Sequence, residues 1–231
     1  MDWLERTLNS SIGMKWTMSL TGLLLFLFVI AHMLGNLQIF AGPDQINSYA
    51  VHLRDFGPLL WVARLGLLIL VLVHIAAAIR LTQLNRAARP VPYAVLTPQV
   101  SGYAARTMLM GGLIILGFIC YHLAHFTLGL TNPAEFALHD ADGRHDVYAM
   151  VVLGFRHPVI SLIYILAMVP LALHLSHGVS SALQTLGANS PKYNTALRAV
   201  GPVVAAVIFI GNCSIPLAVL AGMVPYPVVG H

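Results

Sequence analysis

Five long apolar stretches dominate this chain of 231 residues. Each of them exceeds the roughly 20 residues that a helix needs to cross about 30 Å of hydrocarbon. Inside a bilayer the backbone N–H and C=O groups find no water, so each stretch must satisfy them internally as a helix. The sequence therefore predicts an all-α fold in which residues 1–231 form one membrane-embedded domain, a bundle of five transmembrane helices. The predicted helices span about residues 15–40, 58–84, 104–130, 158–186 and 196–223.

Composition excludes most soluble classes of protein. Charged residues make up only 9% of the chain and the mean hydropathy is +0.80, whereas a soluble domain carries about 25% charged residues. The net charge of +4 is too small to indicate nucleic-acid binding. Cys120 and Cys213 lie in apolar stretches without zinc or disulfide spacing, so we interpret them as helix-packing residues. The polar N-terminus and the long first apolar run predict a retained helix rather than a cleaved signal peptide.

The basic residues predict the orientation of the chain. With the N-terminus in the cytoplasm, eight of the 12 Lys and Arg residues lie on the inner side of the membrane and four on the outer side. The positive-inside rule favours this orientation, with the C-terminus and the expected loops 41–57 and 131–155 outside. The inner set is Arg6, Lys15, Arg80, Arg86, Arg89, Arg106, Lys192 and Arg198, and the outer set is Arg54, Arg64, Arg144 and Arg156.

Four histidines, one in each of the first four apolar stretches, are the main candidates for function: His32, His74, His122 and His177. A titratable ring inside a membrane span is rare and costly, so each is a functional candidate. At about 1.5 Å per residue, His32 and His122 fall nearer the outer face and His74 and His177 nearer the inner face, with the two levels about 10–15 Å apart. One imidazole from each of two facing helices is the axial ligand set of a bis-histidine haem. A zinc site needs three or four ligands at one depth and fits less well.

Two of these ligand assignments are ambiguous. His125 follows His122 by one helical turn on the same face, and His174 stands in the same relation to His177. Either member of each pair could ligate a metal, and the other could form a hydrogen bond with a haem propionate or a quinone. The remaining histidines lie in loops or at the chain end, and we interpret them as solvated: His52, His139, His145, His157 and His231.

Several long motifs give the chain a specific resemblance over nearly its whole length. They are NSSIGMKWTMSLTG, VIAHMLGN, INSYAVHLRDFGP, VHIAAAIRLTQLNRAARPVPY, RTMLMGGLIILGFICYHLAHFTLG and HLSHGVSSALQTLGANSPKY, in this order. With them the chain resembles the di-haem cytochrome b subunit that anchors succinate dehydrogenases and fumarate reductases. The resemblance implies an outer haem b held by His32 and His122 and an inner haem b held by His74 and His177. The YHL step at His122 and the HG step at His177 favour these two residues over His125 and His174.

The family implies a three-subunit complex in the inner membrane of a bacterium, as in respiratory complex II of the tricarboxylic acid cycle. A flavoprotein and an iron–sulfur subunit would dock on the cytoplasmic face, and this chain would pass their electrons to menaquinone or ubiquinone. The chain has no Rossmann glycine pattern and no cysteine cluster for iron–sulfur, so we expect no dehydrogenase activity from it alone. We also expect contact with membrane lipid, and we expect no nucleic acid as a partner. Several copies of the complex could assemble into a higher oligomer.

The chain departs from part of the family at Leu175. Some menaquinol-oxidising fumarate reductases carry a glutamate there, two residues before the ligand of the fourth helix. No Asp or Glu lies within the five predicted spans. We therefore do not expect a transmembrane proton path of that kind, and the sequence leaves both the direction of the reaction and the quinone type open.

Polar residues near the span ends are further candidates. Arg80 and Arg106 at the inner ends and Arg64 at an outer end could pair with haem propionates or could extend to the membrane interface. A quinone site needs a polar donor beside an apolar slot. The candidates for that donor are Lys15, Ser19 and Arg106 on the inner side, and Asn36, Gln38 and His125 on the outer side.

Two other functions compete with this interpretation. The chain could be the cytochrome b anchor of another membrane dehydrogenase, such as a hydrogenase or a formate dehydrogenase, which a copurifying nickel or molybdenum subunit would reveal. It could also be a haem-free transporter in which the histidines relay protons, and a preparation without a Soret band would favour that class.

Overall fold

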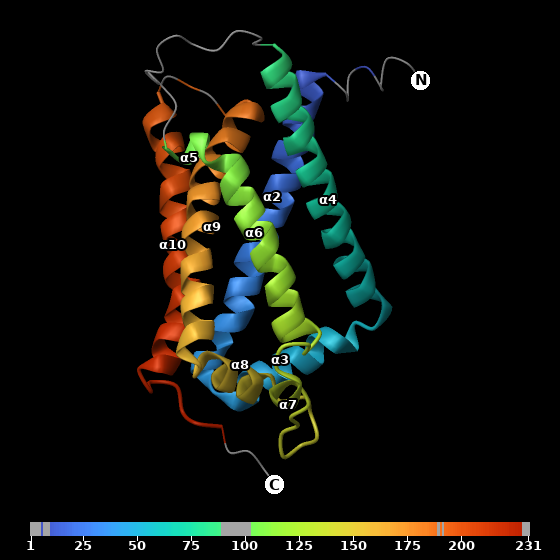
Figure 1. The fold of residues 1–231 in the computed structure, drawn as a ribbon, viewed down its shortest axis with the longest axis vertical. Helices are drawn as coiled ribbons and strands as arrows, with labels where there is room; N and C mark the ends of the chain where they lie inside the picture. The colour runs from blue at the N-terminus through green and yellow to red at the C-terminus, as the bar shows by residue number, and fades with distance from the viewer. Residues whose placement is uncertain (1–5, 7–9, 89–102, 189, 191, 228–231) are drawn as a thin grey trace.

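The computed structural model describes residues 6, 10–88, 103–188, 190 and 192–227 (Figure 1). Within these residues every regular element is a helix, and strand-like pairing is limited to an isolated bridge between His139 and His145. Five segments are long and apolar enough to span a membrane, which confirms that part of the prediction. They are α2 with its continuation η1 (Ser11–Asn36 and Leu37–Ala41), α4 (Pro58–Ala87), α6 with η2 (Met108–His122 and Leu123–Thr127), α9 (Pro158–Thr185) and α10 (Asn194–Leu220).

Local chemistry at the helix ends explains where the spans begin. Ser10 accepts a hydrogen bond from the Gly13 N–H at 3.0 Å, so α2 starts before the expected position near residue 15. Both α4 and α9 begin with a proline. At this position a backbone N–H would have no acceptor within the helix, so the missing N–H of proline costs no hydrogen bond. The third span starts at Met108 rather than near residue 104. The residues before it form a separate short helix, α5 (Tyr103–Arg106).

The two expected outer loops contain helices, and the loop prediction was wrong there. The first holds α3 (Pro43–Asp55), and the second holds α7 (Pro133–Phe136) and α8 (Val147–Phe155). Pro43 opens α3 directly after Gly42, whose φ is 103°. Asp146 caps α8 by accepting a hydrogen bond from the Ala149 N–H at 2.9 Å. Gly, Pro and Asp are also common in turns, so the pattern of residue types did not separate a capped helix from a loop.

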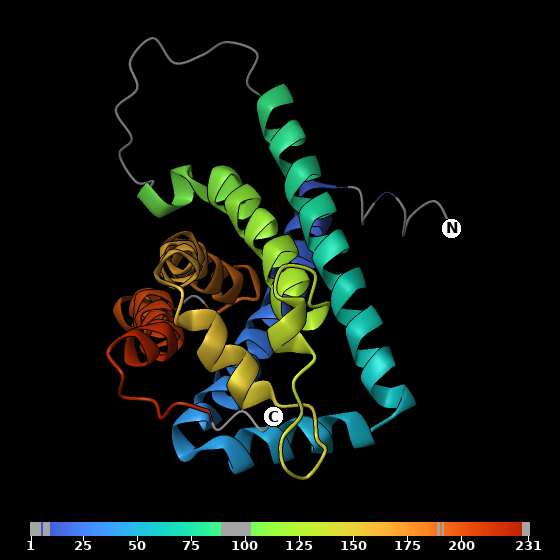
Figure 2. The same cartoon turned by 60° about the horizontal axis from the view of Figure 1, so that its bottom comes forward.

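Helix α9 is the centre of the packing. It contacts α10, α2 and α6, and α2 in turn packs along α4 (Figures 1 and 2). The short helices α3, α7 and α8 lie across one end of the molecule, called the α8 end below. Helix α5 and the start of α2 lie at the opposite end, called the α5 end. Large apolar side chains are exposed along α4, including Leu59, Val62, Leu65 and Ile69, as a lipid-facing helix requires.

Helices α9 and α10 cross closely at Gly201. A Cβ added at Gly201 on α10 would overlap the carbonyl oxygen of Ser176 and the hydroxyl oxygen of Ser180 on α9. Small residues let membrane helices approach each other this closely. Beside the crossing, Met33, Leu175, Ala205 and Ile208 form a buried cluster among α2, α9 and α10.

We predict that Gly201→Ala lowers the stability of the chain by about 1–3 kcal/mol, because a backbone carbonyl can make room only if the two helices separate. Gly66→Ala on α4 is the matched control, since an added Cβ there meets nothing within 4 Å. Alanine is favoured over glycine in a helix by up to about 1 kcal/mol, so the control should be neutral or slightly stabilising. Thermal unfolding in detergent measures the stability of both variants. Equal unfolding temperatures for the two variants would contradict the close contact between α9 and α10 at Gly201.

A polar network ties α3 to the loop before α8. Asn47, which is 1% exposed, donates from Nδ2 to the carboxylates of Asp140 and Asp146 at 3.1 Å each. Arg144 donates to Asp140 at 2.8 Å and to Asp44 at 2.9 Å. Burial by itself would raise the pKa of Asp140, but the hydrogen bonds from Arg144 and Asn47 outweigh burial and hold this pKa below its usual value.

The depressed pKa of Asp140 predicts an acid-sensitive cap. Its contribution to stability is complete above the unfolded-state pKa of about 3.9 and is lost as the pH falls through the lower folded-state pKa. Hydrogen-exchange protection of the α3 and α8 amides should therefore hold at neutral pH and fall below about pH 4. An Asp140→Asn variant should lack part of this protection already at neutral pH. Protection in the parent chain that is unchanged through the acid range would disprove the role of the carboxylate.

Candidate functional site

Two pairs of histidine rings face each other between the long helices. His32 near the end of α2 and His122 at the end of α6 have ring centroids 5.6 Å apart, with their planes at 89°. His74 in α4 and His174 in α9 have ring centroids 6.2 Å apart, with their planes at 64°. Each pair therefore joins two different helices, and together the pairs involve all four helices that carry a candidate histidine.

The two pairs lie at different levels along the helices. Helix α2 carries both His32 and Thr21, which contacts the His74 ring. At about 1.5 Å per residue, these two residues are about 16 Å apart along the helix. Helix α9 carries both His174 and Tyr164, which contacts His122, and these two are about 15 Å apart by the same measure. The first pair is nearer the α8 end and the second nearer the α5 end.

The structure places His174, rather than the expected His177, opposite His74. Both residues are half-buried, and Nδ1 of His174 is buried without a hydrogen-bond partner among the described residues. Two residues three apart in a helix point about 60° away from each other. Which of them faces α4 depends on the rotation of α9 about its own axis, and the sequence motif carries no information on that angle.

Thr21 fixes the proton of His74. The Thr21 hydroxyl donates its one hydrogen to the Thr17 carbonyl at 2.7 Å, so its oxygen accepts from Nδ1 of His74 at 3.1 Å. A neutral imidazole with Nδ1 protonated carries its lone pair on Nε2. The Thr21 contact therefore leaves Nε2 of His74 unprotonated, which is also what an outer-shell partner does for a histidine ligand in metal sites.

Tyr164 joins the two histidines at the end of the third span. Its hydroxyl lies 2.9 Å from Nδ1 of His125 and 3.4 Å from Nδ1 of His122. The hydroxyl has one proton, so one histidine accepts it and the other donates to the oxygen. If His122 keeps Nε2 free for a metal, it donates through Nδ1, and Tyr164 donates to His125. Nε2 of His125 then carries a proton in a fully buried position, where it has no partner among the described residues.

A change of helix type separates His122 from His125. The segment Leu123–Thr127 is a π-helix, in which the Leu128 N–H donates to the Leu123 carbonyl at 2.9 Å. Such wide turns inside α-helices are frequent at functional sites. Here the turn starts directly after His122, and His125 packs on Phe126 and next to Gly154 of α8. His122 thus faces His32 while His125 is enclosed in the core.

Asn36 occupies one nitrogen of His32. The Asn36 amide nitrogen lies 3.0 Å from Nε2 of His32 and donates to it, one turn further along α2. The His32 ring also stacks on Phe28, with centroids 5.5 Å apart. A metal bound through Nε2 therefore requires the Asn36 side chain to rotate away.

The structure does not gather the other predicted residues into one site, and Arg106 lies in the separate helix α5 rather than in the third span. Arg64, Arg80, Arg106 and Lys15 are exposed, Arg64 over the Trp61 ring at 5.1 Å, and Ser19 is buried in α2. Gln38 accepts a hydrogen bond from Gln45 at 3.0 Å. The three quinone candidates that we expected on the outer side, Asn36, Gln38 and His125, thus all have partners within the chain.

Within each pair, the separation of the two rings matches that of two imidazoles on opposite sides of one metal ion. A metal–imidazole bond is about 2 Å long, so two rings on opposite sides of a metal have centroids roughly 6 Å apart. The separations of 5.6 and 6.2 Å agree with this requirement. Among the described residues, no group of three or more His, Cys, Asp or Glu side chains could hold a metal ion. A haem, which supplies four nitrogens itself, needs only two protein ligands.

No family model, curated protein or solved structure matches this chain in searches of all three kinds.

Sequence reasoning missed Thr21 and Tyr164. Both carry a hydroxyl group inside an apolar span, where polar groups commonly form hydrogen bonds between helices. That signal marks them as candidates but does not name their partners, because the partner depends on how neighbouring helices are rotated and shifted. The structure supplies this register, and with it the role of each hydroxyl.

We predict that His74→Ala and His174→Ala affect the same metal site, and that His177→Ala leaves it intact. Two imidazoles that share a haem iron are both needed for its six-coordinate, low-spin signal, so loss of either His74 or His174 should abolish that signal. EPR spectra of the purified variants measure this outcome, and His177→Ala is the matched control one turn away. Loss of the signal in the His177 variant but not in the His174 variant would show that α9 is rotated the other way.

Proposed function

We propose that the chain is the membrane-anchor cytochrome b of a succinate:quinone oxidoreductase. It would hold two bis-histidine haems b and pass electrons between an iron–sulfur subunit and membrane quinone. The observation that supports this proposal most is the presence of two imidazole pairs, with centroids 5.6 and 6.2 Å apart, at two levels of an assembly of apolar helices. The motif resemblance to di-haem anchors implies the same number of haems.

The side chains of this protein would hold and orient the two haems. His32 and His122 are the proposed ligands nearer the α8 end, and His74 and His174 those nearer the α5 end. Bound between such pairs, haem iron supplies one-electron redox chemistry without an open coordination position. Thr21 keeps the His74 proton on Nδ1, and Tyr164 can do the same for His122, so both rings present Nε2.

The charge distribution supports docking of the partner subunits at the α5 end. Arg80, Arg86 and Arg106 are exposed there, as are Lys192 and Arg198 at the start of α10. At the α8 end the exposed carboxylates of Asp44 and Asp142 pair with Arg144. We propose that the α5 end is cytoplasmic in a bacterial inner membrane and receives the iron–sulfur subunit with its flavoprotein. The His74–His174 pair is then the nearer of the two to that subunit.

An optical spectrum with haem quantitation tests the function of the purified chain. We expect a Soret band and two b-type haems per chain by pyridine haemochrome assay. A preparation without a Soret band would support the haem-free transporter and overturn the proposal. Mass spectrometry of the intact complex separates the remaining alternative, because a nickel or molybdenum subunit in place of a flavoprotein would indicate a different dehydrogenase.

Removing the Tyr164 hydroxyl should alter one haem only. Tyr164→Phe keeps the ring packing but removes the group shared by His122 and His125. Loss of such an outer-shell hydrogen bond lowers metal affinity by about tenfold or more. Redox titration should therefore show a shifted potential or partial loss of the haem at His32 and His122, with the other haem unchanged. Thr21→Val is the reciprocal variant and should affect only the His74–His174 haem, so equal effects on both haems would refute these roles.

A further inference from the structure

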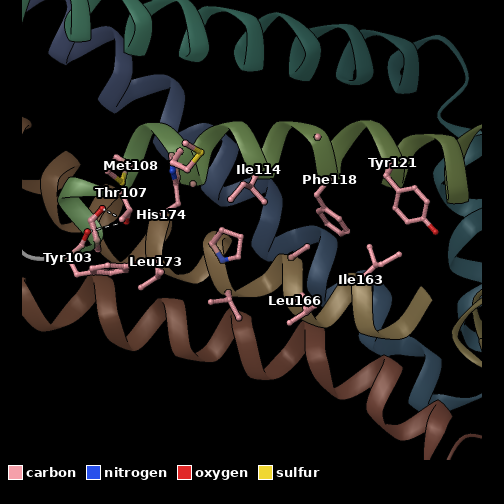
Figure 3. Close-up of a pocket in the computed structure, with 17 residues that line it drawn as sticks. Tyr103, Thr107, Met108, Ile114, Phe118, Tyr121, Ile163, Leu166, Leu173 and His174 are labelled. Carbon is pink, nitrogen blue, oxygen red and sulfur yellow. Dashed lines mark hydrogen bonds between the residues drawn. The ribbon is translucent and has the colours of Figure 1, made fainter. Parts of the chain in front are cut away.

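A pocket of about 670 Å³ lies at the corner where α3 ends and α4 begins (Figure 2). Two exposed arginines, Arg54 of α3 and Arg64 of α4, line it. Its other lining residues are Gly57, Pro58, Leu60 and Trp61. By contrast, a groove of about 720 Å³ between α6 and α9 has no Lys or Arg among the described residues that line it (Figure 3). The corner pocket therefore differs from this groove in carrying two positive charges.

No carboxylate of the chain neutralises these two charges. Every ion pair among the described residues involves Arg144, which pairs with aspartates of the polar network beside α3. Asp55 follows Arg54 directly, but it is exposed and forms no ion pair with either pocket arginine within the part of the chain that the structure describes. The two guanidinium groups are thus available to an anion from outside the chain.

Arg64 belongs to the apolar span rather than to a loop. It lies six residues after Pro58, about 9 Å along α4 from the first residue of the helix. A charge that faces lipid at this depth is costly unless its side chain extends to the interface. The guanidinium carbon of Arg64 lies 5.1 Å from the centroid of the Trp61 ring, one turn nearer the helix start. The side chain therefore extends toward the interface, where tryptophan is enriched and lipid head groups lie.

Further along α4 from the pocket, the helix presents an apolar surface. Val62, Leu65 and Ile69 are each more than half exposed, at 65%, 55% and 59%. Side chains of this kind on a transmembrane helix contact the acyl chains of lipids. A ligand at this corner would meet two guanidinium groups at one end and an apolar helix surface at the other. A phospholipid carries an anionic phosphate and acyl chains in the same order.

We propose that the corner pocket binds the head group of an anionic phospholipid, whose acyl chains follow α4. The phosphate oxygens would accept hydrogen bonds from Arg54 and Arg64, because a guanidinium group can donate two parallel hydrogen bonds to one phosphate. The ammonium group of a zwitterionic lipid would be repelled by the two arginines, so an anionic head group is preferred. Inorganic phosphate has the same oxygens but no acyl chains, so it lacks the apolar part of the interaction.

Photo-cross-linking tests the site on the purified full-length chain. The probe is phosphatidylglycerol with a diazirine in the acyl chain close to the glycerol, and peptide mass spectrometry maps the cross-links. Arg54→Gln and Arg64→Gln each remove one positive charge from the pocket. Arg156→Gln is the matched control, since this exposed arginine lies at the same end of the molecule but outside the pocket, 4.5 Å from the centroid of the Tyr226 ring.

The expected result is labelling of the peptides that contain residues 54–64 in the parent chain. The half-saturating concentration of the probe should rise at least about tenfold in each pocket variant, the effect of one lost charge-assisted hydrogen bond. It should stay unchanged in Arg156→Gln. Arg64→Lys keeps the charge without the paired donors and should bind with intermediate affinity. Labelling confined to other helices, or an equal loss of affinity in the control, would overturn the proposal.

Competition experiments identify the source of the phosphate group. Unlabelled phosphatidylglycerol should displace the probe, whereas phosphatidylethanolamine with the same acyl chains should need about a tenfold higher concentration. Inorganic phosphate at about a hundredfold excess should leave the labelling unchanged. Equal displacement by the zwitterionic lipid, or displacement by inorganic phosphate, would overturn the assignment to an anionic phospholipid. Loss of a haem from Arg64→Gln with undiminished labelling would assign this guanidinium group to a haem propionate instead.

Discussion

An imidazole nitrogen inside an apolar helix assembly can find a partner only within the protein or a bound group, because the bilayer offers none. This requirement organises the four helices that carry the candidate ligands. The His74 ring meets His174 on one side and Thr21 on the other, which joins α4 to both α9 and α2. The His122 ring meets His32 and Tyr164 and so joins α6 to the same two helices. Helix α10 supports α9 from outside through the close crossing at Gly201.

The π-helix after His122 explains how two histidines one turn apart take different roles. His122 faces His32, while His125 is fully buried beside Tyr164 and against α8. An added Cβ at Gly154 would lie 3.3 Å from His125, so the glycine allows α8 to close over this ring. The α3–α8 cap, held by Asn47 and Arg144, therefore belongs to the same structural unit as the histidine pair beneath it.

The sequence alone predicted the features that depend on composition along the chain. The five spans follow from the length of the apolar stretches, and His32, His74 and His122 stand out because polar rings are rare in such stretches. Features that depend on the relation between helices were not predictable. The rotation and register of neighbouring helices decide which of His174 and His177 faces His74. They also decide the partners of Thr21 and Tyr164 and the groove between α6 and α9. The caps at Pro43 and Asp146 were missed because the same residue types also form turns.

The His174 side chain faces His74 and also lines an apolar groove between α6 and α9, so one residue belongs to both features. The most direct measurement of the two metal positions is anomalous scattering at the iron absorption edge from crystals of the purified complex. Two peaks per chain are expected, one between His32 and His122 and one between His74 and His174, about 15 Å apart along the helices. A single peak, no peak, or a peak bonded to His125 or His177 instead would contradict the proposed arrangement.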